Sequence, residues 1–165
     1  MNSKAGVLYC TELVDALGRV IERDGPTLNL VPVEGLNHML AVTLKGAAPV
    51  TNWYIGLYEG DYSPQPDVKA ATLPGLATES TAYSSATRVL FTSGPVAAGS
   101  VDNSAALAEF TFTAKKTIYG AFISSAPTKG ATTGVLLSVV RFPSPKVQDT
   151  GSILRVLAGP TATPV

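Results

Sequence analysis

The chain has one cysteine, Cys10, and one histidine, His38, among its 165 residues. A single cysteine excludes a disulfide within the chain, and we expect Cys10 to be a small buried side chain. A single histidine leaves catalytic arrangements of the Ser/His/Asp or Cys/His type without support beyond His38 itself, and it offers a metal ion no second imidazole. We interpret His38 as a surface or boundary residue, and the sequence predicts no catalytic, cofactor-binding or metal-binding residue.

Charge is also scarce. Asp, Glu, Lys and Arg make up 15% of the chain, and twelve basic residues balance twelve acidic ones. Binding to a phosphate backbone needs a clustered positive excess, so we expect no nucleic-acid partner. Low charge together with 45% apolar residues indicates a surface that is partly covered in an assembly. The alternative is an ordinary monomer with a polar Ser/Thr surface.

Long apolar runs and recognisable acidic sites are missing too. The longest run, within residues 135–140, is far below the roughly 20 residues that span a bilayer, and residues 1–4 lead into no apolar core of a secretory signal. We expect folding in a cytoplasm and no membrane partner. Glu59 and Asp61 are interpreted as solvated turn residues. Glu79 and Glu109 are a conceivable glycosidase pair, but twelve acids offer many pairs without meaning.

Residues 52–60, which contain the only tryptophan, are predicted to form a central strand. Alternation places Trp53, Ile55 and Leu57 on one face, and Tyr54, Gly56 and Tyr58 on the other. Both faces are expected to be covered. Trp53, Tyr54 and Tyr58 are interpreted as packed residues, with a sugar-binding platform as the less favoured alternative.

Residues 5–25 admit two interpretations. Leu13, Val14, Leu17, Val20 and Ile21 recur at helical spacing, which favours a helix over residues 11–23. Residues 15–18, Asp-Ala-Leu-Gly, instead fit a hairpin turn between two segments rich in strand formers. We favour the hairpin, closed at residues 24–26 and conceivably an arm.

One short helix is predicted, over about residues 34–45. Leu36, Met39, Leu40 and Leu44 form one apolar stripe, and Lys45-Gly46 supplies the cation and glycine expected at a helix end. This helix should pack on the sheet next to Trp53.

The remainder of the chain reads as short strands separated by glycine and proline. Strands are predicted near residues 78–83, 88–92, 108–113, 117–124, 133–142 and 152–157, with a stop at Ser144-Pro145. The expected fold is mainly β, a β-sandwich or jelly roll in one domain over residues 1–158. Residues 159–165 are expected to be a tail outside the secondary structure, whose removal leaves the fold intact.

The order of several short motifs resembles a family of small structural proteins encoded in the head genes of tailed bacteriophages. The resemblance covers about residues 7–157. It is carried by the Asp-x-x-Gly hairpin, residues 34–37 opening a helix, residues 53–57, 78–83, 101–104 before 110–112, 118–122, 128–136 and 149–151.

The resemblance implies a capsid decoration, or cement, protein similar to jelly-roll proteins that clamp major capsid subunits from outside. The implied protein is not an enzyme, needs no cofactor, and is located on the virion surface. Residues 61–86, residues 125–132 and the termini are expected to touch the major capsid protein, and a homodimer is expected through edge strands. The alternative is a fibre module that recognises carbohydrate or a host surface.

Overall fold

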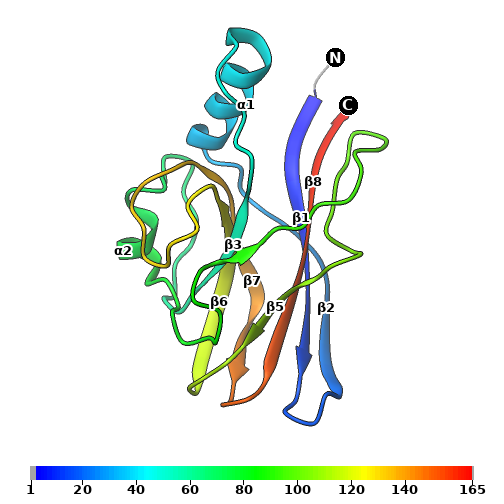
Figure 1. Cartoon of the computed structure of the whole chain (residues 1–165), viewed down its shortest axis with the longest axis vertical. Coiled ribbons are helices and arrows are strands. Elements are labelled where there is room, and N and C mark those ends of the chain that lie inside the picture. The colour runs from blue at the N-terminus through cyan, green and yellow to red at the C-terminus, as the bar shows by residue number, and fades with distance from the viewer. Residues whose placement is uncertain (1–2, 165) are drawn as a thin grey trace.

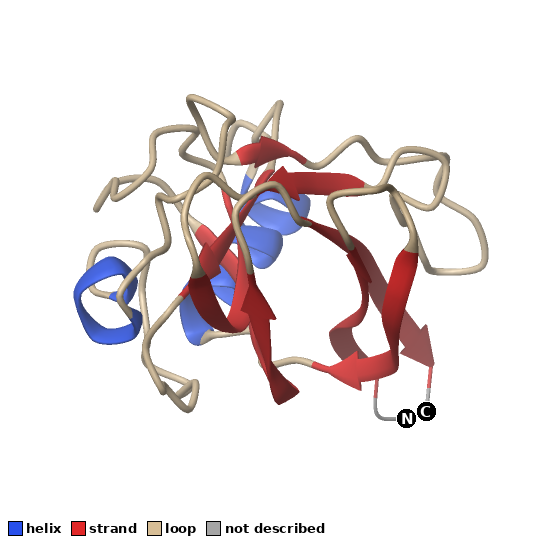
Figure 2. Ribbon diagram, turned by 90° about the horizontal axis from the view of Figure 1, so that it is seen from below, coloured by secondary structure: helices blue, strands red, loops and turns tan. Residues whose placement is uncertain are grey.

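The computed structural model describes residues 3–164 and contains two antiparallel sheets of four strands (Figure 1). The first sheet has the order β2-β1-β8-β5, formed by β2 (Val20–Leu28), β1 (Ser3–Val14), β8 (Ile153–Pro164) and β5 (Ala108–Thr111). The second has the order β4-β3-β6-β7, formed by β4 (Val89–Leu90), β3 (Tyr54–Tyr58), β6 (Lys116–Ser124) and β7 (Leu136–Gln148). Figure 2 shows the two sheets facing each other. The predicted mainly β sandwich is confirmed.

The core lies between the inward faces of the two sheets. Tyr9, Phe110 and Val156 come from the first sheet, while Ile55 and Phe142 come from the second. Apolar burial of this kind is the main favourable term in folding. The core therefore joins the first and last strands of the chain to its middle.

The predicted central strand is β3, and both of its faces are covered. Ile55 and Leu57 point into the core between the sheets. Tyr58 belongs to a second apolar cluster on the outer face, where residues 61–86 cover the sheet. Gly56 lies opposite Phe122 on β6, and Gly120 lies opposite Tyr58. A Cβ atom at either glycine would collide with that aromatic ring, so each glycine makes room for a partner across the strand pair.

The N-terminal hairpin is confirmed and the helical alternative is excluded. One carboxylate oxygen of Asp15 accepts hydrogen bonds from the N–H groups of Leu17 and Arg19, both at 2.9 Å, and Gly18 has a φ of 82°. The predicted closing turn at residues 24–26 is wrong, because β2 runs through them to Leu28. Nor is the hairpin an arm, since β1 pairs with β8 along all twelve of its residues.

The predicted tail is wrong as well. Residues 159–164 continue β8 and pair with the first half of β1, while Val165 lies outside the described residues. Proline misled the prediction. Beyond Val156 the ladder with β5 ends, and residues 99–101 contribute only an isolated bridge and scattered hydrogen bonds on that side. Such an edge position tolerates Pro160 and Pro164. For the same reason β7, an edge strand, runs past the predicted stop at residues 144–145.

The predicted helix is α1 (Val33–Lys45), and it ends at Gly46 in the left-handed conformation as expected. A second helix, α2 (Leu73–Ala77), was not predicted. The strand expected at residues 78–83 is absent from the described chain, where Glu79 and Tyr83 instead form isolated bridges with Tyr58 and Phe112. Neither helix within residues 3–164 is long and apolar enough to cross a membrane.

The orientation of α1 differs from the prediction. The side that faces the sandwich carries Gly35, which is buried, and the half-buried His38, Met39 and Val42. Leu36, Leu40 and Leu44, three of the four residues in the predicted stripe, are exposed. Gly35 explains the difference, because a Cβ there would come within 2.7 Å of the Leu137 carbonyl oxygen. The helix approaches β7 on its glycine side, and the leucines face away.

Candidate functional site: an uncharged apolar cleft beside α1

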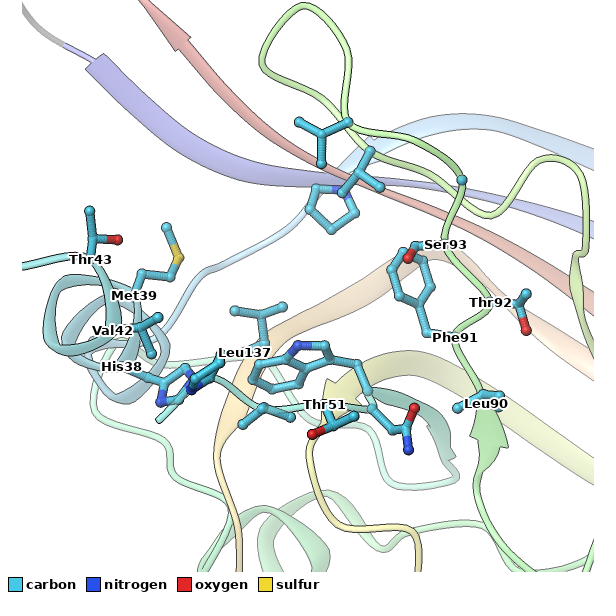
Figure 3. Close-up of a pocket in the computed structure, with 18 residues that line it drawn as sticks. His38, Met39, Val42, Thr43, Thr51, Leu90, Phe91, Thr92, Ser93 and Leu137 are labelled. Carbon is cyan, nitrogen blue, oxygen red and sulfur yellow. The ribbon is translucent and has the colours of Figure 1, made fainter. Parts of the chain in front are cut away.

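An apolar cleft of about 690 Å³ opens between α1 and residues 90–96. Figure 3 shows Met39 and Val42 on the helix side and Phe91 on the opposite side, with Leu137 between them. A smaller hollow of about 250 Å³ continues toward β1 and shares five lining residues with the first: Met39, Val96, Val101, Leu137 and Pro160. We call the two hollows together the α1 cleft.

The helix wall of the cleft is fixed at its first turn. One oxygen of the Glu34 carboxylate, Oε2, accepts hydrogen bonds from the N–H groups of Ala70 at 2.9 Å and Leu136 at 2.7 Å. The N–H of Val33 donates to the Pro66 carbonyl oxygen at 2.9 Å. The beginning of α1 is thus joined to β7 and to residues 61–86, whereas its later turns project beyond the sheets (Figure 1).

The opposite wall is held by backbone hydrogen bonds and by one buried amide. The N–H of Phe91 donates to the Trp53 carbonyl oxygen at 2.8 Å, and the N–H of Ala162 donates to the Gly99 carbonyl oxygen at 2.7 Å. Asn103 is buried; its side-chain oxygen accepts from the N–H of Ala158 at 2.8 Å, and its amide nitrogen donates to the Val156 carbonyl oxygen at 3.1 Å. The wall opposite α1 therefore depends on the far end of β8.

The chemistry of the α1 cleft is that of an apolar receptor. None of the side chains lining either hollow is an acid, a lysine or an arginine, and His38 is the one histidine among them. The His38 ring meets the half-buried Trp53 ring edge to face, with centroids 5.6 Å apart. Asn52, Thr51 and Ser93 add a few neutral polar groups. Such a lining favours an apolar ligand group with few hydrogen bonds.

Charge is distributed unevenly between the two ends of the sandwich. From Gly35 to Tyr58, Lys45 is the only acid or basic residue other than histidine, and residues 89–101 and 156–165 contain none. The opposite end carries the Asp15–Arg19 pair at 2.7 Å and the Lys115–Asp149 pair at 3.4 Å. The α1 cleft therefore lies at a nearly charge-free end of the molecule.

The two loops predicted to touch a partner are joined by a buried ion pair. Arg88 Nε and Nη2 donate to the two carboxylate oxygens of Glu79 at 2.8 and 2.7 Å, and both side chains are at most 3% exposed. Glu79 also accepts from the N–H of Gly130, and Arg88 donates to the Ala126 carbonyl oxygen. Residues 61–86 and 125–132 thus form one rigid cover rather than two free loops.

Lys129 strengthens this cover. Its Nζ donates to the Tyr83 carbonyl oxygen at 2.9 Å and lies 3.7 Å from the centre of the Tyr83 ring. Partial burial lowers the pKa of Lys129, and this effect outweighs the nearby Glu79 charge, which raises the pKa. Burial raises the pKa of Tyr83 in turn, and the charge of Glu79 adds to that effect.

The candidate acids of the sequence do not meet in one site. Glu79 pairs with Arg88, whereas Glu109 pairs with Arg155 at 2.7 Å on the exposed side of the first sheet. Glu59 and Asp61 are also separated, because Glu59 pairs with Lys116 at 2.9 Å and Asp61 pairs with Arg141. Within residues 3–164 there is no cluster of three or more His, Cys, Asp or Glu side chains suited to a metal ion.

Other predicted positions are partly corrected. Tyr58 is buried and donates to the Val140 carbonyl oxygen at 2.8 Å, in agreement with packing. Cys10 is only half-buried, which contradicts the expected buried position; desolvation raises the pKa of its thiol. His38 is a boundary residue as expected, although it lies on the packed side of α1.

Sequence reasoning missed the cleft and a buried lysine. The missed signal for the cleft was the charge-free stretch at residues 89–101.

The missed lysine is Lys146 on β7. It is 1% exposed and pairs with Glu22 and with Asp24 Oδ2 at 2.6 Å, which joins β2 to the second sheet. Burial lowers the pKa of Lys146, but the hydrogen bonds that its ammonium donates to Asp24 and Glu22 outweigh this effect and raise the pKa overall.

No protein-family model and no curated protein sequence matches the chain.

Proposed function

We propose that this chain is a non-enzymatic structural protein that binds the outside of a bacteriophage capsid and cements neighbouring major capsid subunits. The motif order described above supplies the phage head context, and the β-rich fold is compatible with the jelly-roll type that it implies. On this proposal the protein is made in the host cytoplasm and is located on the virion surface.

The observation that carries the proposal is the α1 cleft at the charge-free end. Its lining offers apolar surface and neutral hydrogen-bonding groups rather than acids and amines, which suits holding a partner by shape. An apolar anchor of the shell protein, such as one or two large aliphatic or aromatic side chains, fits this lining. Because a shell presents many copies, modest single contacts add up to firm attachment.

The partner surface differs from the sequence expectation. Residues 61–86 and 125–132 are bonded to each other over the second sheet, so they form the rigid cover described above. The cleft, rather than these loops alone, becomes the main contact with the capsid. The rigid cover then supplies additional polar contacts.

Co-sedimentation with empty capsids that lack the protein tests this proposal. Val96 is 79% exposed and lines both hollows, so Val96→Asp should keep the fold while placing a carboxylate in the contact. We expect binding at least about 30-fold weaker, the effect typical of a central contact residue.

Val147→Asp is the matched control, because Val147 is 53% exposed on β7 and lines neither hollow. It should bind capsids as the unmodified chain does. If the unmodified chain stays in the supernatant at micromolar concentration, or if both variants bind equally well, the proposal is wrong.

Trp53 supports one alternative, a fibre module that recognises carbohydrate, because this half-buried indole lines an open cleft and sugars stack on such rings. Titration with glycans, monitored by the fluorescence of Trp53, measures sugar binding. A saturable shift with sugars and no binding to capsids would favour the alternative.

A further inference from the structure

The exposed face of α1 carries a row of large apolar side chains. Leu36, Leu40 and Leu44 are 38%, 56% and 71% exposed, and Val33 is 51% exposed. At 3.6 residues per turn these four positions fall within about 80° of the helix circumference and extend over about 16 Å. We call these four residues the leucine ridge.

The leucine ridge is distinct from the α1 cleft. Met39 and Val42, which line the cleft, face the sandwich, whereas Leu40 and Leu44 are mostly exposed. The helix therefore has two apolar faces, and only one of them is covered by this chain. An amphipathic surface helix would carry polar residues on the second face.

We propose that the leucine ridge packs against the same ridge of a second copy of this chain, with the two helices antiparallel across a two-fold axis near Leu40. Leucines at positions i, i+4 and i+8 form the type of ridge that interdigitates in the commonest class of helix packing. A two-fold contact is self-complementary, so one surface suffices for both partners.

Charge supports this pairing. Between Glu34 and Lys45 the helix carries no acid, lysine or arginine, so two copies approach without repulsion along the ridge. Glu34 is occupied by the N–H groups of Ala70 and Leu136. Lys45, Asp67 and Lys69 are exposed and take part in none of the ion pairs of residues 3–164.

Lys45 and Asp67 lie at opposite ends of the ridge, and Lys69 lies near Asp67. Lys45 is in the last turn, and Asp67 follows Pro66, whose carbonyl oxygen accepts from the first helical N–H, that of Val33. An antiparallel pairing brings Lys45 of each copy toward Asp67 of the other. Glu34, Asp67 and Lys69 give the first end a net charge of −1, and Lys45 gives the other end +1. An antiparallel pairing therefore brings opposite net charges together, whereas a parallel pairing brings like net charges together.

The edge strands are poorer candidates for self-association. On β2 the charged run Glu22, Arg23 and Asp24 is followed by Pro26, a combination that discourages strand pairing. Two other edges are short, since β5 has four residues and β4 has two. The long edge β7 contains Pro143 and Pro145 and is bridged to Leu30 at Val139. The dimer expected from the sequence is thus assigned to helices instead of edges.

Four side chains per copy bury less than the roughly 800 Å² per partner of a standard interface. The dimer should accordingly be reversible, with a dissociation constant in the micromolar range. Sedimentation equilibrium of the purified chain over a micromolar concentration series should show its mass rising from 17.0 kDa toward twice that value.

Leu40→Lys should weaken dimerisation at least about 30-fold, because each dimer carries the change twice at its centre. Leu44→Lys is a second variant at a more exposed position. The matched control is Ile21→Lys, since Ile21 is 60% exposed near the opposite end and should dimerise normally. Circular dichroism checks that all three variants fold.

The charge pattern allows a stricter test. Lys45→Asp and Asp67→Lys should each weaken the dimer by roughly fivefold, as expected for exposed ion pairs, and the double variant should recover it. In a Cys10→Ser background, Leu40→Cys should form an intermolecular disulfide much faster than Ile21→Cys.

A mass of 17.0 kDa at every concentration, or a Leu40→Lys variant that dimerises like the unmodified chain, would overturn the proposal. So would a monomeric chain whose Leu40→Lys variant loses capsid binding, because the ridge would then belong to the shell contact. The dimer is measured without capsids, so its failure and that of the cement function are separable.

Discussion

The two ends of the sandwich are built from the same strands but carry different chemistry. At one end tight turns join β1 to β2 and β7 to β8. Asp15 and Arg19 pair across the first turn, and Asp149 in the second pairs with Lys115 before β6. At the other end stand α1, the far ends of β1 and β8, and residues 89–101, with almost no charge. Exposed ion pairs add little stability but keep a surface hydrated. On the proposed function, the charged end faces water and the nearly charge-free end faces the partner.

The largest expected effect comes from shortening the charge-free end. A chain that stops at Ala158 loses Gly159–Pro164, which pair with Ser3–Leu8 and bond to residues 99–101. Total stabilities are only about 5–15 kcal/mol, and half of the β1–β8 ladder would be lost. We expect no cooperative thermal transition by circular dichroism.

Leu17→Ser at the tip of the charged end is the control. Leu17 is 78% exposed, and its replacement should change the free energy of unfolding by less than about 0.5 kcal/mol. A truncated chain that melts near the temperature of the full chain would show that the two ends do not differ in this way.

Alkaline pH should lower the stability of the fold without changing the charge of the residues that line the α1 cleft. Burial raises the pKa of Tyr9, Tyr58 and Tyr83 in the folded chain, and the carboxylates of Asp24 and Glu22 raise that of Lys146. A group whose pKa is higher in the folded chain than in the unfolded chain contributes its full stabilisation at pH values below its unfolded pKa, about 10 for tyrosine and 10.4 for lysine. That stabilisation is lost as the pH rises toward the folded pKa.

Each such group lowers the free energy of unfolding by up to about 1.4 kcal/mol per pH unit above its unfolded pKa. Denaturant titrations from pH 7 to 12 measure the slope, and tyrosine absorbance should show three of the six tyrosines ionising only on unfolding. Constant stability through pH 11 would contradict the burial of these groups.

Capsid binding should fall only when unfolding begins, because the cleft lining includes no acid, tyrosine or lysine.

A smaller, localised effect is expected from the ion pairs. Arg88→Met leaves the Glu79 carboxylate buried without its partner and should cost about 3–5 kcal/mol. Arg19→Met, at the exposed pair of the charged end, should cost under about 1 kcal/mol. Chemical denaturation compares them directly, and similar losses would mean that burial does not separate the two pairs.

Much of the fold was predictable, because alternation and turn chemistry are local. The two faces of β3, the Asp15–Gly18 turn and the Lys45-Gly46 helix end could all be read from neighbouring residues. Proline caused the main errors, at residues 144–145 and 160–164, because its tolerance depends on whether a strand lies at an edge. That is a property of the assembled sheet.

The candidate site was much harder to predict. Which side of α1 packs depends on Gly35 meeting the β7 backbone, a contact between residues about a hundred positions apart. The apolar stripe alone pointed to the leucines. The Glu79–Arg88 pair was equally hidden, because no local pattern distinguishes a buried arginine from an exposed one.

The pairing of Ser3 with Pro164 has a practical consequence for engineering. Both chain ends emerge beside α1, so a peptide or fluorescent label fused at either terminus would sit against the surface that we assign to docking. An insertion between Ala16 and Leu17 would instead project from the opposite pole. On the proposed function, that hairpin tip is the attachment point that this architecture favours for displaying antigens or enzymes on a particle.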